Sequence, residues 1–128
     1  NRMNNLKVAA AVILTTAVAV SCTHEPISTA APAVSFKNDI VPVLTARCAL
    51  NSACHSGAVN SGNNINLDSA AAYTSLQARH LVITDNPAAS LLYVEVSSGI
   101  MPKAPASPLD AAQINMILNW IKQGAPEN

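Results

Sequence analysis

The chain has 128 residues, with seven basic and seven acidic side chains and a formal net charge of zero. This balance argues against nucleic-acid binding, which needs a basic patch. The aromatic residues are only one Phe, two Tyr and one Trp, so the core is poor in large side chains. A domain this small usually relies on a disulfide, a metal or a cofactor in addition to its core. We therefore expect a bound group to contribute to the fold.

An export signal is predicted over residues 3–21. Lys7 precedes an apolar run from Val8 to Val20, which is shorter than the roughly 20 residues that a membrane-spanning helix needs. The run fits the apolar region of a secretory signal peptide. The sequence AVSC then resembles a bacterial lipobox, in which the cysteine, here Cys22, becomes the lipid-modified first residue. An ordinary signal peptide that leaves Cys22 as a spare thiol is the alternative.

Residues 22–35 are rich in Pro, Ser, Thr and Ala, and we expect them to form a flexible tether. The expected protein is thus exported, and is periplasmic or associated with the outer membrane through a lipid at Cys22. Outside the cytoplasm a cysteine pair can form a disulfide.

Four helices are predicted after the tether. The first covers residues 36–48, and its regular part is expected to start near Asp39, because Pro42 is tolerated only in a first turn. The second covers residues 69–77, with Asp68 as its cap. The third covers residues 87–96, for which a strand at 92–96 is the alternative.

The last helix carries the clearest signals. Ser107 is the predicted N-cap, Pro108 suits the first helical position and Asp110 can complete a capping box. An apolar stripe follows at helical spacing: Ile114, Ile117, Leu118 and Ile121. Gly124 then ends the helix. These elements predict an all-α domain.

The stretch CALNSACHSG contains the residues most typical of a functional site. Cys54 and His55 are adjacent, as in the haem-attachment motif C-x-x-C-H, but five residues separate Cys48 from Cys54. In that motif two cysteines form thioether links to the vinyl groups, and the histidine binds the iron. Residues 50–52 would have to bulge outward to bring Cys48 within reach, and Asn and Ser favour such a turn.

Three other interpretations of this stretch remain open. A Cys48–Cys54 disulfide suits the compartment but does not account for the adjacent histidine. A zinc site needs about four ligands, and within the domain only His80 could join these three residues. A nucleophilic Cys–His pair would need a third orienting group, for which the sequence has no signature.

A second haem ligand is predicted at Met101. Haem c electron carriers generally complete the iron with a methionine sulfur, often in a Met-Pro pair on a downstream loop, and the chain has GIMPKAP there. Pro102, Pro105 and Pro108 make this loop stiff. Met116, in contrast, falls on the last helix. The alternative is that Met101 only fills a gap in the core.

Five segments of residues 35–125 together resemble a small family of exported bacterial class I c-type cytochromes, found as lipoproteins or as modules of larger secreted proteins. They are FKNDIVPVL, INLDSAAAYTSL, LVITDNPAASLLYVEV, IMPKAP and LDAAQINMILNWIKQGA. The most specific parts are Cys54-His55, Met101-Pro102 and the NWIKQGA ending. The resemblance implies a cytochrome c-like domain over residues 36–125, built around one covalent haem c.

The resemblance also implies roles for single residues. Cys48 and Cys54 would form the thioether links, His55 would be the proximal iron ligand and Met101 the distal one. The five-residue spacing departs from the family pattern, and attachment through Cys54 alone is the alternative.

Two aromatic residues have an implied place as well. Phe36 and Trp120 would lie where the first and last helices cross, beside the haem edge.

The function expected from these residues is single-electron transfer between redox partner proteins, and not catalysis. The mild acidity of the chain after Cys22 favours partners with a basic docking patch. A haem enzyme or sensor is the alternative if Met101 leaves the sixth iron position open, with Arg79 and His80 as the only suggestive helpers. A haem-free binding lipoprotein, stapled by a Cys48–Cys54 disulfide, is the third hypothesis.

Overall fold

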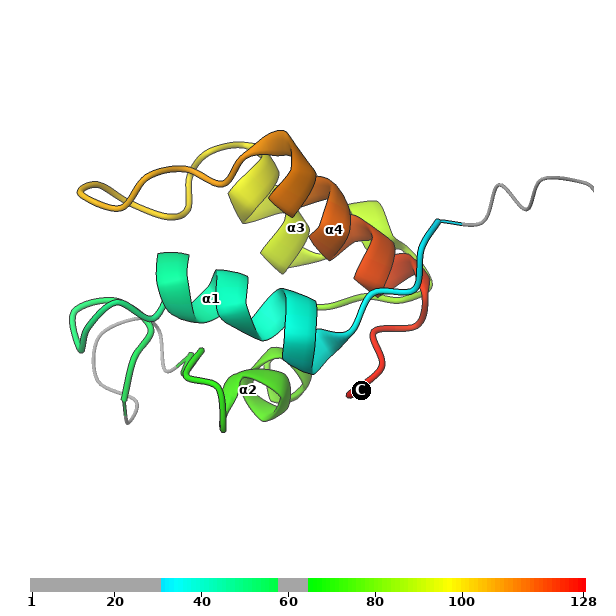
Figure 1. Ribbon diagram of the computed structural model, residues 1–128, viewed down its shortest axis with the longest axis horizontal. Helices are drawn as coiled ribbons and strands as arrows, with labels where there is room; N and C mark the ends of the chain where they lie inside the picture. Colours follow the sequence, from blue (N-terminus) through cyan, green and yellow to red (C-terminus); the bar gives the residue numbers. More distant parts are fainter. Residues whose placement is uncertain (1–30, 58–64) are drawn as a thin grey trace, which may run out of the picture.

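The computed structural model describes residues 31–57 and 65–128. The predicted signal peptide, Cys22 and most of the tether lie outside these residues. The described part contains four α-helices, one π-helical turn and one 3-10 turn, and no strand. The prediction of an all-α domain is therefore confirmed (Figure 1). None of the described helices has the length and apolar character needed to cross a membrane.

The first helix begins with a wide turn. Residues Phe36–Ile40 form a π-helical turn, η1, and Val41–Arg47 continue it as α1. Ser35 caps the start, because its hydroxyl accepts a hydrogen bond of 3.1 Å from the Asn38 N–H. Pro42 has no N–H to donate, and the turn before it widens so that Val41 bonds to the carbonyl of Phe36. The predicted helix over residues 36–48 is thus present, and its regular α-helical part starts at Val41, close to the predicted start near Asp39, with Pro42 in its first turn.

The second helix, α2, spans Ala72–Ala78. The carbonyl of Asp68 accepts bonds of 2.9 Å from Ala71 and Ala72. Its carboxylate, however, accepts from the N–H of Gly57 at 2.7 Å and does not cap the helix. The predicted side-chain cap is therefore wrong, because a neighbouring loop competes for the same carboxylate.

The predicted third helix is split at Ser90. Pro87–Ala89 form a 3-10 turn, η2, and Leu91–Ser97 form α3, while Ser90 between them is extended. The Ser90 side chain is fully buried, and its hydroxyl accepts a hydrogen bond of 2.8 Å from the N–H of Ile83. The strand alternative for residues 92–96 is excluded.

The last helix, α4, spans Ala111–Lys122. Its N-cap is Asp110, and the predicted cap at Ser107 is wrong. Asp110 and Gln113 form a reciprocal capping box, with bonds of 2.8 and 3.1 Å, which satisfies two N–H groups at once. Gly124 ends the helix as predicted, in a left-handed conformation with φ of 90°.

One end of the domain is closed by aromatic contacts and by the chain termini. The ring of Phe36 lies 5.0 Å from that of Trp120 and 5.2 Å from that of Tyr73, measured between centroids. Gln123 binds the backbone of residues 32–34 through both its amide atoms, at 2.8 and 2.9 Å. Val34 is buried, so the packed region extends to the N-terminal side of Phe36.

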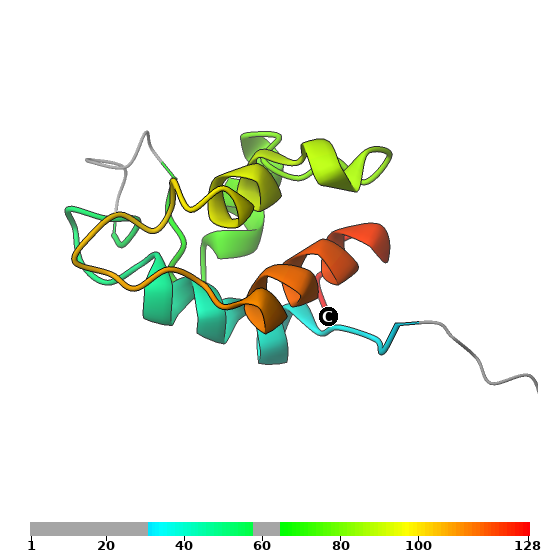
Figure 2. The ribbon, with the colours of Figure 1, turned by 90° about the horizontal axis from the view of Figure 1, so that it is seen from above.

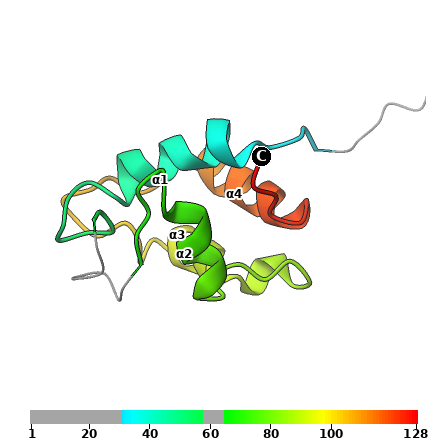
Figure 3. The same cartoon turned by 90° about the horizontal axis from the view of Figure 1, so that it is seen from below.

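The opposite end is formed by two loops. One follows α1 and contains residues 48–57, and the other, residues 98–110, joins α3 to α4. Figures 1, 2 and 3 show both loops extending from the same side of the domain, the side opposite to the C-terminus. Since α3 packs against α4, the second loop is held between two helices that are in contact.

Candidate functional site

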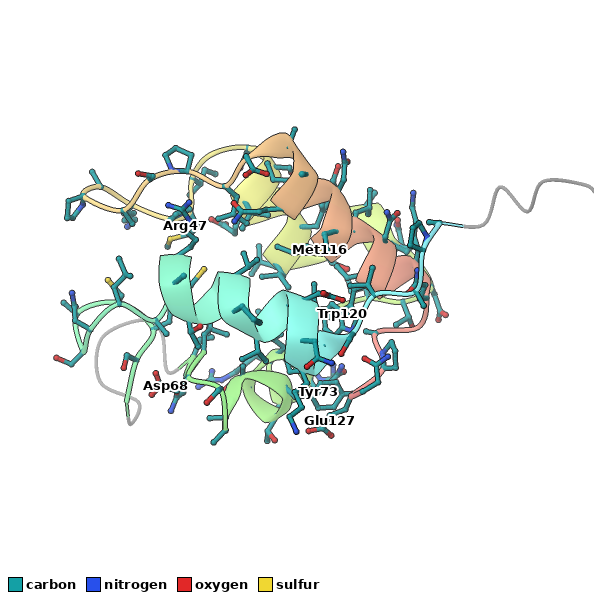
Figure 4. All side chains as sticks on the ribbon, viewed as in Figure 1. Arg47, Asp68, Tyr73, Met116, Trp120 and Glu127 are labelled. Atoms are coloured by element: carbon teal, nitrogen blue, oxygen red, sulfur yellow. The ribbon has the colours of Figure 1, made fainter. Side chains whose placement is uncertain are left out.

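A pocket of about 560 Å³ lies at the loop end of the domain. Its walls come from the end of α1 with the following loop, from α3, and from residues 101–106. Three buried leucines complete it: Leu67, Leu76 and Leu81. The volume lies within the range of about 300–1,000 Å³ that is usual for ligand pockets. Figure 4 shows Arg47 between the end of α1 and the loop after α3, whereas Met116 and Trp120 lie further back on α4.

The two cysteines line this pocket as free thiols. Cys48 is the residue that ends α1, and it is buried, while Cys54 is half-buried. Burial, and then the neighbouring Cys54, raise the pKa of Cys48 from 9.0 to about 11. Cys48 therefore remains a protonated thiol at neutral pH. In this structure the two cysteines are not joined by a disulfide.

The enlarged loop between the cysteines is organised by Asn51. Its side-chain oxygen accepts a hydrogen bond of 2.9 Å from the N–H of Ala53, and its carbonyl accepts one of 3.0 Å from Cys54. Such a side-chain-to-backbone bond is what makes Asn common in turns. Residues 50–52 are exposed, as the predicted bulge requires. The turn brings Cys54 back toward the end of α1.

His55 is fixed through both of its backbone groups. Its N–H donates to the carbonyl of Cys48 at 3.0 Å, and its carbonyl accepts from Leu67 at 2.7 Å. Its side chain lines the pocket, and the ring nitrogen Nδ1 is buried with no hydrogen-bond partner. A buried polar atom without a partner is costly and uncommon in a folded protein. The imidazole ring is therefore positioned by the backbone bonds of His55 and not by a hydrogen bond at Nδ1.

Met101 lines the same pocket from the opposite loop. Its side chain is half-buried, and its N–H donates a hydrogen bond of 3.0 Å to the carbonyl of Glu95 near the end of α3. The structure thus brings together all four domain residues predicted for haem: Cys48, Cys54, His55 and Met101. Two thiols, one imidazole and one thioether fit a c-type haem, whose vinyl groups take the thiols and whose iron takes the other two.

The other candidates from the sequence lie elsewhere. Arg79 and His80 are exposed at the end of α2 and do not line the pocket. Met116 is half-buried against the core. Among residues 31–57 and 65–128, no three side chains of His, Cys, Asp or Glu come together as a group of metal ligands. Cys22, the predicted lipid site, lies outside the described residues.

The aromatic pair implied by the resemblance is in contact but lies away from the pocket. Phe36 and Trp120 meet where η1 crosses α4, as expected. Neither ring lines the pocket, so they belong to the closed end of the domain. The pocket walls therefore do not support the expected position of these two rings beside a haem edge.

Three charged residues on the pocket wall were not predicted. Arg47 and Glu95 are half-buried there, and Lys103 is exposed. Arg47 directly precedes Cys48 and Lys103 follows Pro102, so their position next to the two motifs could have identified them as pocket residues. For Glu95 the sequence has no comparable signal, because its place depends on the packing of α3.

No protein-family model, no curated protein and no solved structure matches this chain.

Proposed function

We propose that this protein is an exported monohaem c-type cytochrome that transfers single electrons between redox partner proteins. The observation that supports this most strongly is the meeting of Cys48, Cys54, His55 and Met101 in one pocket. Met101 lies far from the other three in the sequence, and nothing in the local spacing requires it to reach them.

The pocket also suits a large, mainly apolar group. Leu67, Leu76 and Leu81 form part of its wall, and all three are buried. The domain has few large side chains of its own, so a bound ring would add apolar surface that the polypeptide lacks. One covalent haem c per chain is the cofactor that these residues support.

The cysteines would attach the group and the other two residues would hold it at the metal. Each thiol would add across one vinyl group: a carbon–sulfur bond forms, and the thiol proton moves to the neighbouring vinyl carbon. When bound, the haem iron supplies one-electron chemistry by alternating between its ferric and ferrous states. His55 and Met101 would hold the iron, and the apolar wall would keep water from them.

Two axial ligands from the protein favour an electron carrier over an enzyme. With His55 and Met101 both bound, no coordination position remains for a substrate. A methionine ligand also raises the reduction potential, which suits electron transfer. Arg79 and His80, the helpers that a peroxidase-like alternative would use, lie outside the pocket.

We further propose that the protein is periplasmic or outer-membrane-associated. The support is the predicted signal peptide at residues 3–21 and the lipobox-like sequence before Cys22. In this arrangement a lipid on Cys22 would tether the domain to a membrane. Cys22→Ala should then move the protein from the membrane fraction to the soluble periplasm.

The functional test is a redox titration of protein made in a host that attaches haem to c-type cytochromes. The protein should be red, should take up one electron reversibly, and should bind carbon monoxide only weakly when reduced. A colourless protein would overturn the proposal. A red protein that binds carbon monoxide readily would replace the carrier by the enzyme or sensor hypothesis.

The same host tests which cysteine matters more. Cys54→Ser should lose more attached haem than Cys48→Ser, because Cys54 is directly joined to His55, whose backbone is fixed on both sides. Equal losses would show that both links contribute equally despite the enlarged loop.

A further inference from the structure

The helix that precedes Met101 is a fixed support. Its entry at Ser90 is fully buried, and the Ser90 hydroxyl bonds to Ile83 at 2.8 Å. The N–H of Leu92 donates to the carbonyl of Leu81 at 3.0 Å. Leu92 and Val96 are buried in the core, and the helix packs against α4. Its C-terminal end therefore has a defined position relative to the pocket.

Met101 is bound to that end through its backbone. In a continued α-helix the carbonyl of Glu95 would accept from the residue four positions on, which is Gly99. Here it accepts instead from the N–H of Met101, at 3.0 Å. The chain must turn back over the last turn of α3 for this bond to form, and the turn places Met101 on the pocket wall.

The turn depends on Gly99, which has φ of 73°. Residues with a side chain are strained in this left-handed region, and glycine is not. A Cβ added at Gly99 would meet nothing within 4 Å. The effect of a larger residue would therefore come from the backbone conformation and not from a clash.

The far side of the loop is also attached. The N–H of Ala106 donates to the carbonyl of Lys103 at 3.1 Å, Leu109 is buried, and Asp110 caps α4. Strain at Gly99 can thus be relieved by releasing the segment around Met101, while α3 and α4 stay packed together.

We propose that Gly99 is a positioning residue for the distal iron ligand: its left-handed turn, which ends α3, holds Met101 in the pocket. The inference rests on the proposed function, because it takes Met101 as the ligand. Gly99 does not itself line the pocket and acts through Met101. It thereby determines whether the sixth iron position is closed, and so whether the protein is a carrier or binds small ligands.

The experiment compares substitutions at Gly99 in the haem-loaded protein with a matched control. Gly124 ends α4 with φ of 90°, and a Cβ there would also meet nothing within 4 Å. Gly124→Ala therefore introduces similar backbone strain away from the pocket. The readouts are the near-infrared sulfur-to-iron band, the affinity of the reduced protein for carbon monoxide, and the helix content with the urea midpoint.

The expected results follow from the strain. Left-handed strain from Gly99→Ala should raise the population with Met101 released by about tenfold, and the affinity for carbon monoxide by the same factor. Gly99→Val should have a larger effect, because β-branched residues tolerate this region least. Gly99→Asn should retain most of the band, because Asn adopts the conformation more readily. Gly124→Ala should change neither readout.

Three outcomes contradict the proposal. If Gly99→Val keeps the band and the weak carbon monoxide binding of the native protein, Gly99 does not position Met101. If Gly124→Ala loses the band as much as Gly99→Ala does at equal loss of stability, the effect is general destabilisation. If the native protein has haem but lacks the band, Met101 is not a ligand, and both the ligand assignment and this inference are overturned.

Discussion

The haem-free protein should lose stability at alkaline pH, and the substitution Cys48→Ala should remove this loss. The pKa of Cys48 is raised to about 11 in the folded chain, first by burial and then by the neighbouring Cys54. In the unfolded chain the thiol loses its proton near its ordinary value of 9.0. Between these two values the unfolded state binds fewer protons than the folded state, so the free energy of unfolding falls as the pH rises.

The size of this effect follows from the difference between the two values. Each pKa unit corresponds to about 1.4 kcal/mol, so a difference of about two units lowers the free energy of unfolding by up to about 3 kcal/mol. Cys48 is only 7% exposed, so little of this is lost to solvent screening. Urea unfolding of the native chain and of Cys48→Ala, each below pH 9 and near pH 11, isolates the thiol from other groups that titrate in this range.

The comparison also reports on haem attachment. In a thioether the sulfur carries no proton, so haem-loaded protein linked through Cys48 should lack the alkaline loss that depends on this residue. If the haem-free native chain and Cys48→Ala lose stability equally between the two pH values, Cys48 is not the buried thiol described here, and the reasoning fails.

Three further predictions concern the ligand, the loop and the last helix. Met101→Ala should abolish the sulfur-to-iron band, lower the reduction potential and increase carbon monoxide binding. Met116→Ala should keep the spectrum and cost only about 1–2 kcal/mol of stability, because Met116 is half-buried. An unchanged spectrum in Met101→Ala would exclude Met101 as the ligand. Asn51→Ala should reduce the yield of attached haem, because it removes the turn that brings Cys54 back toward α1. An unchanged yield, measured when the host's haem-attachment capacity is limiting, would show that the turn is dispensable. Asp110→Ala should lower the free energy of unfolding by about 1 kcal/mol, and Ser107→Ala by less than about 0.5 kcal/mol; the reverse order in urea unfolding would contradict the capping box.

Much of the fold could be predicted because its signals are local. The apolar stripe of α4, the stop at Gly124 and the place of Pro42 in an early helical turn all follow from neighbouring residues. The helix starts were less predictable. Ser107 and Asp110 are both good caps, and only the reciprocal bond with Gln113 decides between them.

Other features depend on contacts between distant segments. The sequence suggests Asp68 as a helix cap, but its carboxylate accepts a hydrogen bond from the N–H of Gly57, in the loop that follows α1. The break at Ser90 depends on a bond to Ile83, which no helix propensity reveals.

The candidate site was predictable in its members but not in its geometry. The adjacency of Cys54 and His55, and the Met-Pro pair at Met101, predicted which residues would take part. The place of Met101 on the pocket wall follows from the end of α3 and from its bond to Glu95. Glu95 itself could not be identified, because nothing in its local sequence distinguishes it from a solvated helix residue.

The central claim, that this chain carries covalent haem on Cys48 and Cys54, is tested most directly by the intact mass of the denatured protein. The protein should be made in a host that matures c-type cytochromes and unfolded before measurement, so that any group held only by contacts is lost. We predict the mass of the processed polypeptide plus one haem, and the same addition to be lost in a double Cys48→Ser, Cys54→Ser variant. A native protein with the mass of the polypeptide alone would contradict the account.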